Sequence, residues 1–85
     1  MIDLEHKFDR GIRKPIEELF AWISVHPDGS EGVLSWRFGD THLPLIGADK
    51  ERIESFRRHA ELVRQATGYP IKLVRYSTRT ELERL

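Results

Sequence analysis

Residues 19–38, LFAWISVHPDGSEGVLSWRF, set two apolar runs on either side of a short segment rich in turn-forming residues. Aromatic and β-branched side chains, which favour strands, dominate residues 20–25, and residues 33–38 alternate in the manner of a strand. We therefore expect a strand over residues 19–26, a turn, and a second strand over residues 33–38, paired as a hairpin.

A helix competes for the first of these runs. Its apolar residues follow a helical spacing behind a proline and two acids, at Ile16, Leu19, Phe20 and Ile23. Against a helix stand the aromatic and β-branched composition, the stop at Pro27 and the strand-like second run. We predict the strand, preceded at most by one helical turn.

The segment between the runs, HPDGSEG over residues 26–32, holds a histidine, two acids and two glycines. In a bend, Pro27 presets φ and the Asp28 carboxylate caps the turn. Gly29 takes a positive φ, and Gly32 suits a bulge where the second strand begins. The alternative is a divalent-metal site made from His26, Asp28, Glu31 and His42. The segment lacks the ligand periodicity of a calcium-binding loop and the paired histidines of a helical zinc site, so we expect a turn.

The pairing register of the hairpin decides which side chains share a face. With Val25 opposite Leu34, one face is wholly apolar and carries Leu19, Ala21, Ile23, Val25, Leu34, Trp36 and Phe38. Phe20 and Trp22 then lie on the second face. A register shifted by one residue would group Phe20 and Trp22 with Trp36 and Phe38, and would strand more polar groups. We prefer the first register because it buries more apolar surface.

Gly39 and Asp40 predict a second turn, and Pro44 confines residues 41–47 to a sheet edge or an irregular return because proline cannot donate to a ladder. Asp49 then caps a helix that ends at Gly68. Its buried stripe is expected at Ile53, Phe56, Ala60, Val63 and Thr67. Ion pairs at i,i+4 are expected between Glu54 and Arg58 and between Arg57 and Glu61.

Residues 70–77 predict the last strand, which carries apolar side chains on both faces. Ile71 and Leu73 are expected to face the helix, and Val74 and Tyr76 to face away. A strand that is apolar on both sides is typical of a central position, or of one covered on its second face. Residues 78–85 add at most one further helical turn.

The fold class that follows is α+β, a small antiparallel sheet with one helix packed on one face, in the order ββ(β)αβ. We expect a single domain over residues 15–85, preceded by a flexible or partner-bound arm over residues 1–14. One helix covers one face of a sheet only. The other face would be an aromatic-rich interaction surface, with interface candidates Phe20, Trp22, Val74 and Tyr76.

Composition narrows the classes of function. The chain has 85 residues, 14 basic and 14 acidic side chains, and therefore a net charge of zero, so no long-range field attracts nucleic acid or an anionic membrane. The absence of cysteine excludes disulfides, thiolate nucleophiles and cysteine-bound zinc. No run is long and apolar enough to span a membrane or to resemble a secretory signal, so we expect a soluble cytoplasmic protein.

Three functions remain at this point. We favour a noncatalytic interaction or assembly module that needs no cofactor and pairs with itself as a homodimer or docks onto another protein. Single-stranded nucleic-acid binding is an alternative, with a cationic cluster at Arg75, Arg79 and Arg84 and with Trp22 or Tyr76 as stacking residues. A small metal-dependent enzyme is less favoured, because Asp28 and Glu31 would lie a strand length, roughly 20 Å, from Asp40 and His42. His59 and His6 are interpreted as surface residues.

Three segments carry a family resemblance: residues 27–32 (PDGSEG), 43–49 (LPLIGAD) and 68–79 (GYPIKLVRYSTR). Over residues 19–85 the chain resembles a group of short bacterial proteins of unknown function. The resemblance implies a bacterial cytoplasmic setting and supports the order of hairpin, helix and strand. It implies no activity.

Overall fold

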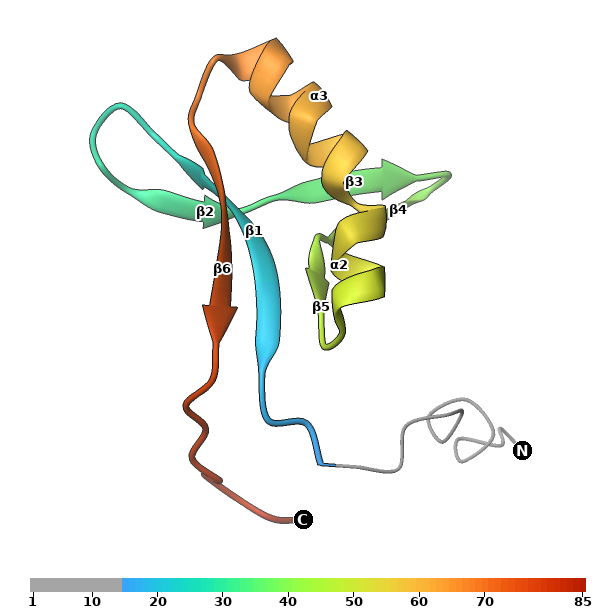
Figure 1. Ribbon diagram of the computed structural model, residues 1–85, viewed down its shortest axis with the longest axis vertical. Helices are drawn as coiled ribbons and strands as arrows, with labels where there is room; N and C mark the ends of the chain where they lie inside the picture. The colour runs from blue at the N-terminus through green and yellow to red at the C-terminus, as the bar shows by residue number, and fades with distance from the viewer. Residues whose placement is uncertain (1–14) are drawn as a thin grey trace.

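The computed structural model describes residues 15–85, so the arm predicted over residues 1–14 lies outside the described residues. The α+β fold is confirmed (Figure 1). In chain order the elements are β1 (Leu19–Val25), β2 (Glu31–Val33), β3 (Ser35–Phe38), β4 (Thr41–Pro44), β5 (Ile46–Gly47), α2 (Lys50–Ser55), α3 (Arg57–Thr67) and β6 (Ile71–Tyr76). The predicted strand at residues 19–26 is thus present, and the competing helix is not.

β1 is the centre of a four-stranded antiparallel sheet. β6 pairs with β1 along one side over its whole length, from Leu19 opposite Tyr76 to Ser24 opposite Ile71. The other side of β1 is shared by two short strands, because β2 pairs with one end of it and β5 with the other. In the described residues β6 pairs with no other strand and is an edge. Of the two alternatives predicted for this strand, the central position is therefore wrong, and cover on its second face stays a prediction.

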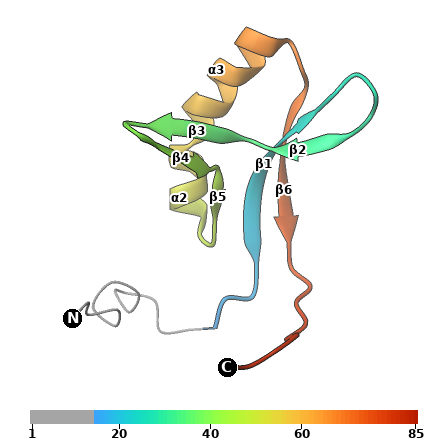
Figure 2. The same cartoon turned by 180° about the vertical axis from the view of Figure 1, so that it is seen from behind.

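Between β2 and β5 the chain leaves the sheet as a separate β3–β4 hairpin. Figures 1 and 2 show this hairpin projecting to the side opposite the β1–β2 loop. At its base, three backbone hydrogen bonds form a closed ring: Leu34 N–H to the Trp22 carbonyl at 2.9 Å, Leu45 N–H to the Leu34 carbonyl at 2.8 Å, and Trp22 N–H to the Leu45 carbonyl at 3.1 Å. The predicted single strand over residues 33–38 is therefore divided at Leu34.

The β1–β2 turn is a three-residue loop. His26 N–H donates to the Ser30 carbonyl at 2.8 Å, and Gly29 N–H donates to the His26 carbonyl at 2.9 Å. Gly29 has φ 86°, the left-handed geometry of a type I turn closed by a glycine bulge. Pro27, Asp28 and Gly29 thus have the predicted roles. The bulge predicted at Gly32 is wrong, because Gly32 pairs regularly with Ser24.

The predicted register of the hairpin is also wrong. Val25 lies opposite Glu31, not Leu34, and Ile23 lies opposite Val33. Loop length explains the error: a three-residue loop fixes the pairing of the residues that flank it, whereas the predicted register would leave all of residues 26–33 as loop. The observed pairing turns Leu34 toward the face of β1 that carries Phe20 and Trp22.

The face that carries Phe20 and Trp22 is the core. Both side chains are buried, with 7% and 5% of their surface exposed, and they pack with Leu34, Leu45, Ile53, Phe56 and Ala60. The prediction that they lie on the uncovered face is therefore wrong. The larger aromatic side chains of β1 fill the wide space under the helices, and the smaller Ala21 and Ile23 point the other way.

The predicted helix is present with the predicted ends. The Asp49 carboxylate accepts the N–H of Arg52 at 2.8 Å, and Gly68 ends α3 with φ 73°. A break at Phe56, which was not predicted, divides it into α2 and α3. The Trp22 indole donates to the Ile53 carbonyl at 2.9 Å, and this carbonyl is the acceptor that Arg57 N–H would use in a continuous helix. The sheet thus anchors the helix at its break.

Three other expectations differ from the structure. The helix stripe is buried at Ile53, Phe56 and Ala60 but ends in an exposed Thr67. Arg57 pairs with Glu54 at i,i+3, at 2.7 Å, where i,i+4 pairs were expected. Residues 77–85 follow β6 without a helical turn.

The indole of Trp22 supplies a test of this arrangement. Trp22→Phe removes the hydrogen bond to Ile53 and part of a buried side chain, so we expect a loss of about 2 kcal/mol in the free energy of unfolding. Trp36→Phe, at a half-buried tryptophan of β3, should cost at most about 1 kcal/mol. Urea unfolding measures both. Equal losses for the two variants would contradict the anchoring role of Trp22.

Candidate functional site

The sheet face opposite the helices is apolar, and among the described residues no helix covers it (Figure 1). Side chains that point to this side alternate with the core residues along each strand. We call the set the open face: Leu19, Ala21, Ile23 and Val25 of β1, Val33 of β2, Ile46 of β5, and Val74 and Tyr76 of β6.

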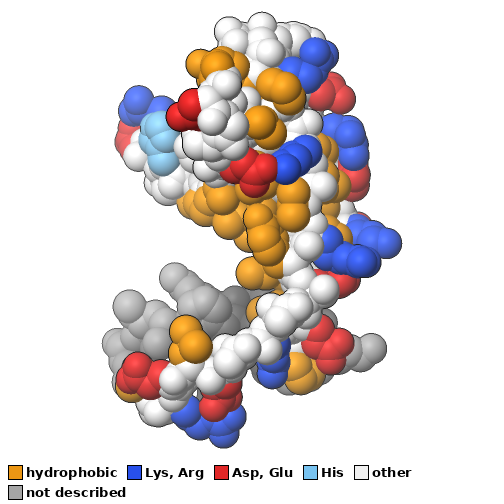
Figure 3. Space-filling view, turned by 90° about the vertical axis from the view of Figure 1, so that its left-hand side faces the viewer, with side chains coloured by type: hydrophobic (Ala, Val, Ile, Leu, Met, Phe, Trp, Pro, Cys, Tyr) orange, Lys and Arg blue, Asp and Glu red, His pale blue; other side chains and the backbone are white. Residues whose placement is uncertain are grey.

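The open face is exposed at its margins, whereas Ala21 and Ile23 in the middle of β1 are buried. Leu19, Val33 and Tyr76 expose 42%, 48% and 52% of their surface. Figure 3, which views the molecule from the side of β2 and β6 in Figure 1, shows hydrophobic side chains gathered across the middle of this side. Contiguous apolar surface of this kind is typical of an interaction site.

A cross-strand ion pair bounds one end of the open face. The Lys72 ammonium of β6 contacts the Glu31 carboxylate of β2, and both side chains are half-exposed. Lys72 and Glu31 share the side of the sheet with Ile23 and Val25, so the pair spans β1. The charged residues of this face therefore neutralise each other.

The structure divides the four predicted interface residues between two places. Val74 and Tyr76 lie on the open face, whereas Phe20 and Trp22 lie in the core. Sequence reasoning missed Leu19 and Val33 as exposed members of the face. The Pro-Asp-Gly loop was the signal that could have found them, because a three-residue loop fixes the register that places Val33 beside Ile23.

The three arginines of the nucleic-acid hypothesis each have a partner within the chain. Arg75 lies 3.9 Å from Glu18, Arg79 donates to the Ile16 carbonyl at 2.8 Å, and Arg84 pairs with Glu81 at 2.6 Å. Trp22 is buried, so it offers no ring face on which a base could stack. Of the predicted stacking residues, Tyr76 alone is exposed.

The candidate metal ligands do not converge. His26, Asp28 and Glu31 lie at the β1–β2 loop, and Asp40 and His42 belong to the β3–β4 hairpin, which projects the other way (Figure 2). Within residues 15–85, no group of three histidine, aspartate or glutamate side chains could hold a metal ion.

A contact between a serine hydroxyl and a histidine ring was not predicted from the sequence. Ser24 Oγ lies 3.3 Å from His26 Nε2, a contact between a hydroxyl and a possible base. The hydroxyl also donates to the Gly32 carbonyl at 3.3 Å, and Ser24 is buried. We interpret the pair as a structural contact of the hairpin, because a buried hydroxyl cannot meet a substrate.

His59 is not the simple surface residue that we predicted. Its ring packs edge-on against Trp36, with centroids 4.7 Å apart, and lies 5.3 Å from Phe38. These contacts join α3 to the β3–β4 hairpin. The second histidine interpreted in this way, His6, lies outside the described residues.

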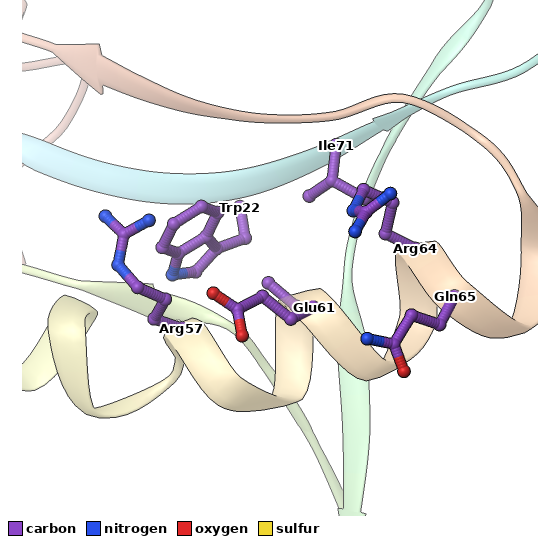
Figure 4. A pocket seen from close by; sticks show the side chains of 7 residues that line it. Trp22, Arg57, Glu61, Arg64, Gln65 and Ile71 are labelled. Carbon is purple, nitrogen blue, oxygen red and sulfur yellow. The ribbon is translucent and has the colours of Figure 1, made fainter.

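A groove of about 270 Å³ separates α3 from the sheet (Figure 4). Its lining residues are Trp22, Arg57, Ala60, Glu61, Arg64, Gln65 and Ile71. The Arg57 guanidinium stacks 5.0 Å from the centre of the Trp22 ring. Hydrogen bonds between Arg57 and Glu54 raise the pKa of the arginine and lower that of the carboxyl, so this cation is already paired.

Comparison of the chain with protein-family models, with curated proteins and with solved structures finds no match. Neither helix of residues 15–85 is long and apolar enough to cross a membrane.

The β1–β2 turn carries a titratable group with a shifted pKa. The Ser30 hydroxyl and backbone N–H donate to the Asp28 carboxylate at 2.6 and 2.9 Å, and these bonds lower the pKa of Asp28 below 3.8. A lowered carboxyl pKa stabilises the folded state above the unfolded-state pKa, and this contribution is lost as the pH falls through the folded-state value.

Ser30→Ala removes the hydroxyl bond and leaves the backbone bond. We expect the pKa of Asp28 to rise part of the way to its usual value, as measured by NMR titration of the side-chain carboxyl carbon. Ser35→Ala, in β3, is the matched control and should leave the titration unchanged. If Ser30→Ala also leaves the pKa where it is, the capping role of Ser30 is wrong.

Proposed function

We propose that this protein is a noncatalytic interaction module that forms a homodimer through the open face. The observation that supports the proposal is the exposure of Leu19, Val33 and Tyr76 on a sheet face that no described helix covers. An 85-residue chain has a thin core, so burial of a second apolar face adds substantially to its stability.

Two features favour a second copy of the chain as the partner. Two sheets can stack face to face about 10 Å apart, and a two-fold axis matches each apolar residue with the apolar surface of the other copy. The net charge is zero, and the Lys72–Glu31 pair neutralises the charged end of the face, so two copies do not repel each other. Another protein with an apolar surface is the alternative partner.

A charge on an exposed residue of the open face, beside Ile23, tests the proposal. Val33→Lys would place an ammonium against apolar surface, so we expect the dimer to dissociate at least about tenfold more readily. Leu62→Lys is the matched control, because Leu62 is 41% exposed on α3, away from the open face. Light scattering after size exclusion measures the mass of the wild type and of both variants over a range of concentrations.

The wild type and Leu62→Lys should be dimers where Val33→Lys is a monomer, and circular dichroism should show that all three fold. A wild type that is monomeric at the highest concentration would overturn the proposal. Equal dissociation of the two variants would also overturn it, because the effect would then not depend on the open face.

A further inference from the structure

The outer edge of β6 leaves backbone groups unpaired. In an antiparallel pair, alternate residues exchange hydrogen bonds with the neighbouring strand. Val25 N–H donates to the Pro70 carbonyl at 2.9 Å, so every second pair from there along the two strands exchanges hydrogen bonds. On β6 the residues that bond to β1 are therefore Lys72, Val74 and Tyr76. The N–H and C=O groups of Ile71, Leu73 and Arg75 therefore point away from β1, and no described strand pairs with them.

The side chains of these same residues point toward the helix side of the sheet. Leu73 lies opposite Trp22 and Ile71 opposite Ser24, both on the core face of β1. Leu73 exposes 38% of its surface, and Ile71 lines the groove beside α3. The edge thus combines free backbone groups with an adjacent apolar groove.

Charge around this groove is uneven. Arg57 is paired with Glu54, whereas Arg64 forms no ion pair with another residue in the described part of the chain. Figure 4 shows Arg64 reaching from α3 toward Ile71. Glu61 also lines the groove, next to Arg57. Lys72 and Arg75 of β6 itself lie near Glu31 and Glu18. Arg64, which lines the groove from α3, is therefore the cation available there to an acidic group.

We propose that the β6 edge binds an extended peptide segment of another protein as an added antiparallel strand. The segment carries an apolar residue opposite Leu73 and an acidic residue two positions later, opposite Ile71 and beside Arg64. Main-chain hydrogen bonds to Ile71, Leu73 and Arg75 supply affinity, and the groove selects the alternate side chains. This surface is distinct from the open face, so the inference does not depend on the proposed dimer.

Charge favours such a peptide over a second copy of β6. Two copies of β6 paired about a two-fold axis through Leu73 would set Arg75 of each copy opposite Ile71 of the other. Each Arg75 would then lie beside an Arg64, and this contact between like charges is unfavourable. An acidic residue in the same position forms an ion pair instead.

The probe is a fluorescein-labelled seven-residue peptide that alternates threonine and valine, with glutamate in place of the third valine, at its sixth position. Fluorescence anisotropy with the wild-type protein should show saturable binding. N-methylation at positions four and six removes the N–H groups that face β6 and should abolish binding, whereas N-methylation at positions three and five should spare it. Binding that survives both modifications, or no binding at all, would overturn the proposal.

Charge exchange tests the position of the peptide. Arg64→Glu should weaken binding about three- to fivefold, as expected for one exposed ion pair, and a lysine peptide should recover the loss. Arg58→Glu, on an exposed position of α3 outside the groove, is the matched control and should bind as the wild type does. An equal effect of the two variants would contradict the proposed placement.

Amide hydrogen exchange distinguishes the two possible occupants of the edge. The peptide should slow exchange at Ile71, Leu73 and Arg75 and leave Lys72 and Val74, already bonded to β1, unchanged. Slowing at Leu73 and Arg75 by higher protein concentration, without peptide, would show that a second copy occupies the edge and would overturn the proposal.

Discussion

The ring of backbone hydrogen bonds that joins Trp22, Leu34 and Leu45 is the constraint on which the rest of the fold depends. It holds the place where β2 leaves the sheet and β5 re-enters it, and all three side chains are buried. The indole of Trp22 then reaches across to the Ile53 carbonyl and fixes the helices on the same side. One residue in the middle of β1 thus links the sheet, the projecting hairpin and the helices.

The two faces of the sheet differ because of this link. Helices α2 and α3 cover the side of Phe20 and Trp22, and the alternation of β1 leaves Leu19, Ala21 and Ile23 on the other side. The same placement leaves β6 as an edge on which Leu73 is exposed. An apolar face and an open strand edge are two separate surfaces on one small chain. We propose a second copy for the first and an extended peptide for the second.

Local chemistry made part of this structure predictable. The turn at Pro27–Gly29, the cap at Asp49 and the stop at Gly68 each depend on a few neighbouring residues, and all were predicted from the sequence. The register does not follow from the apolar pattern, because the three-residue loop fixes the pairing of Val25 with Glu31. The division at Leu34 and the break at Phe56 depend on contacts with Trp22 from distant parts of the chain, which periodicity does not reveal. For the candidate site, strand alternation alone predicts that Val74 and Tyr76 lie on the face away from the helices. The placement of Leu19 and Val33 on that face requires the correct hairpin register.

The central claim is that the face opposite the helices makes contact with a second copy while Trp22 stays inside. Isotope-filtered NOE spectroscopy on a mixture of labelled and unlabelled protein tests it most directly, because it detects contacts between copies only. We predict such contacts at Leu19, Val33 and Tyr76 and none at Trp22 or Phe56. Contacts between copies at Trp22, or none at Val33 in a sample whose mass is that of a dimer, would contradict the account.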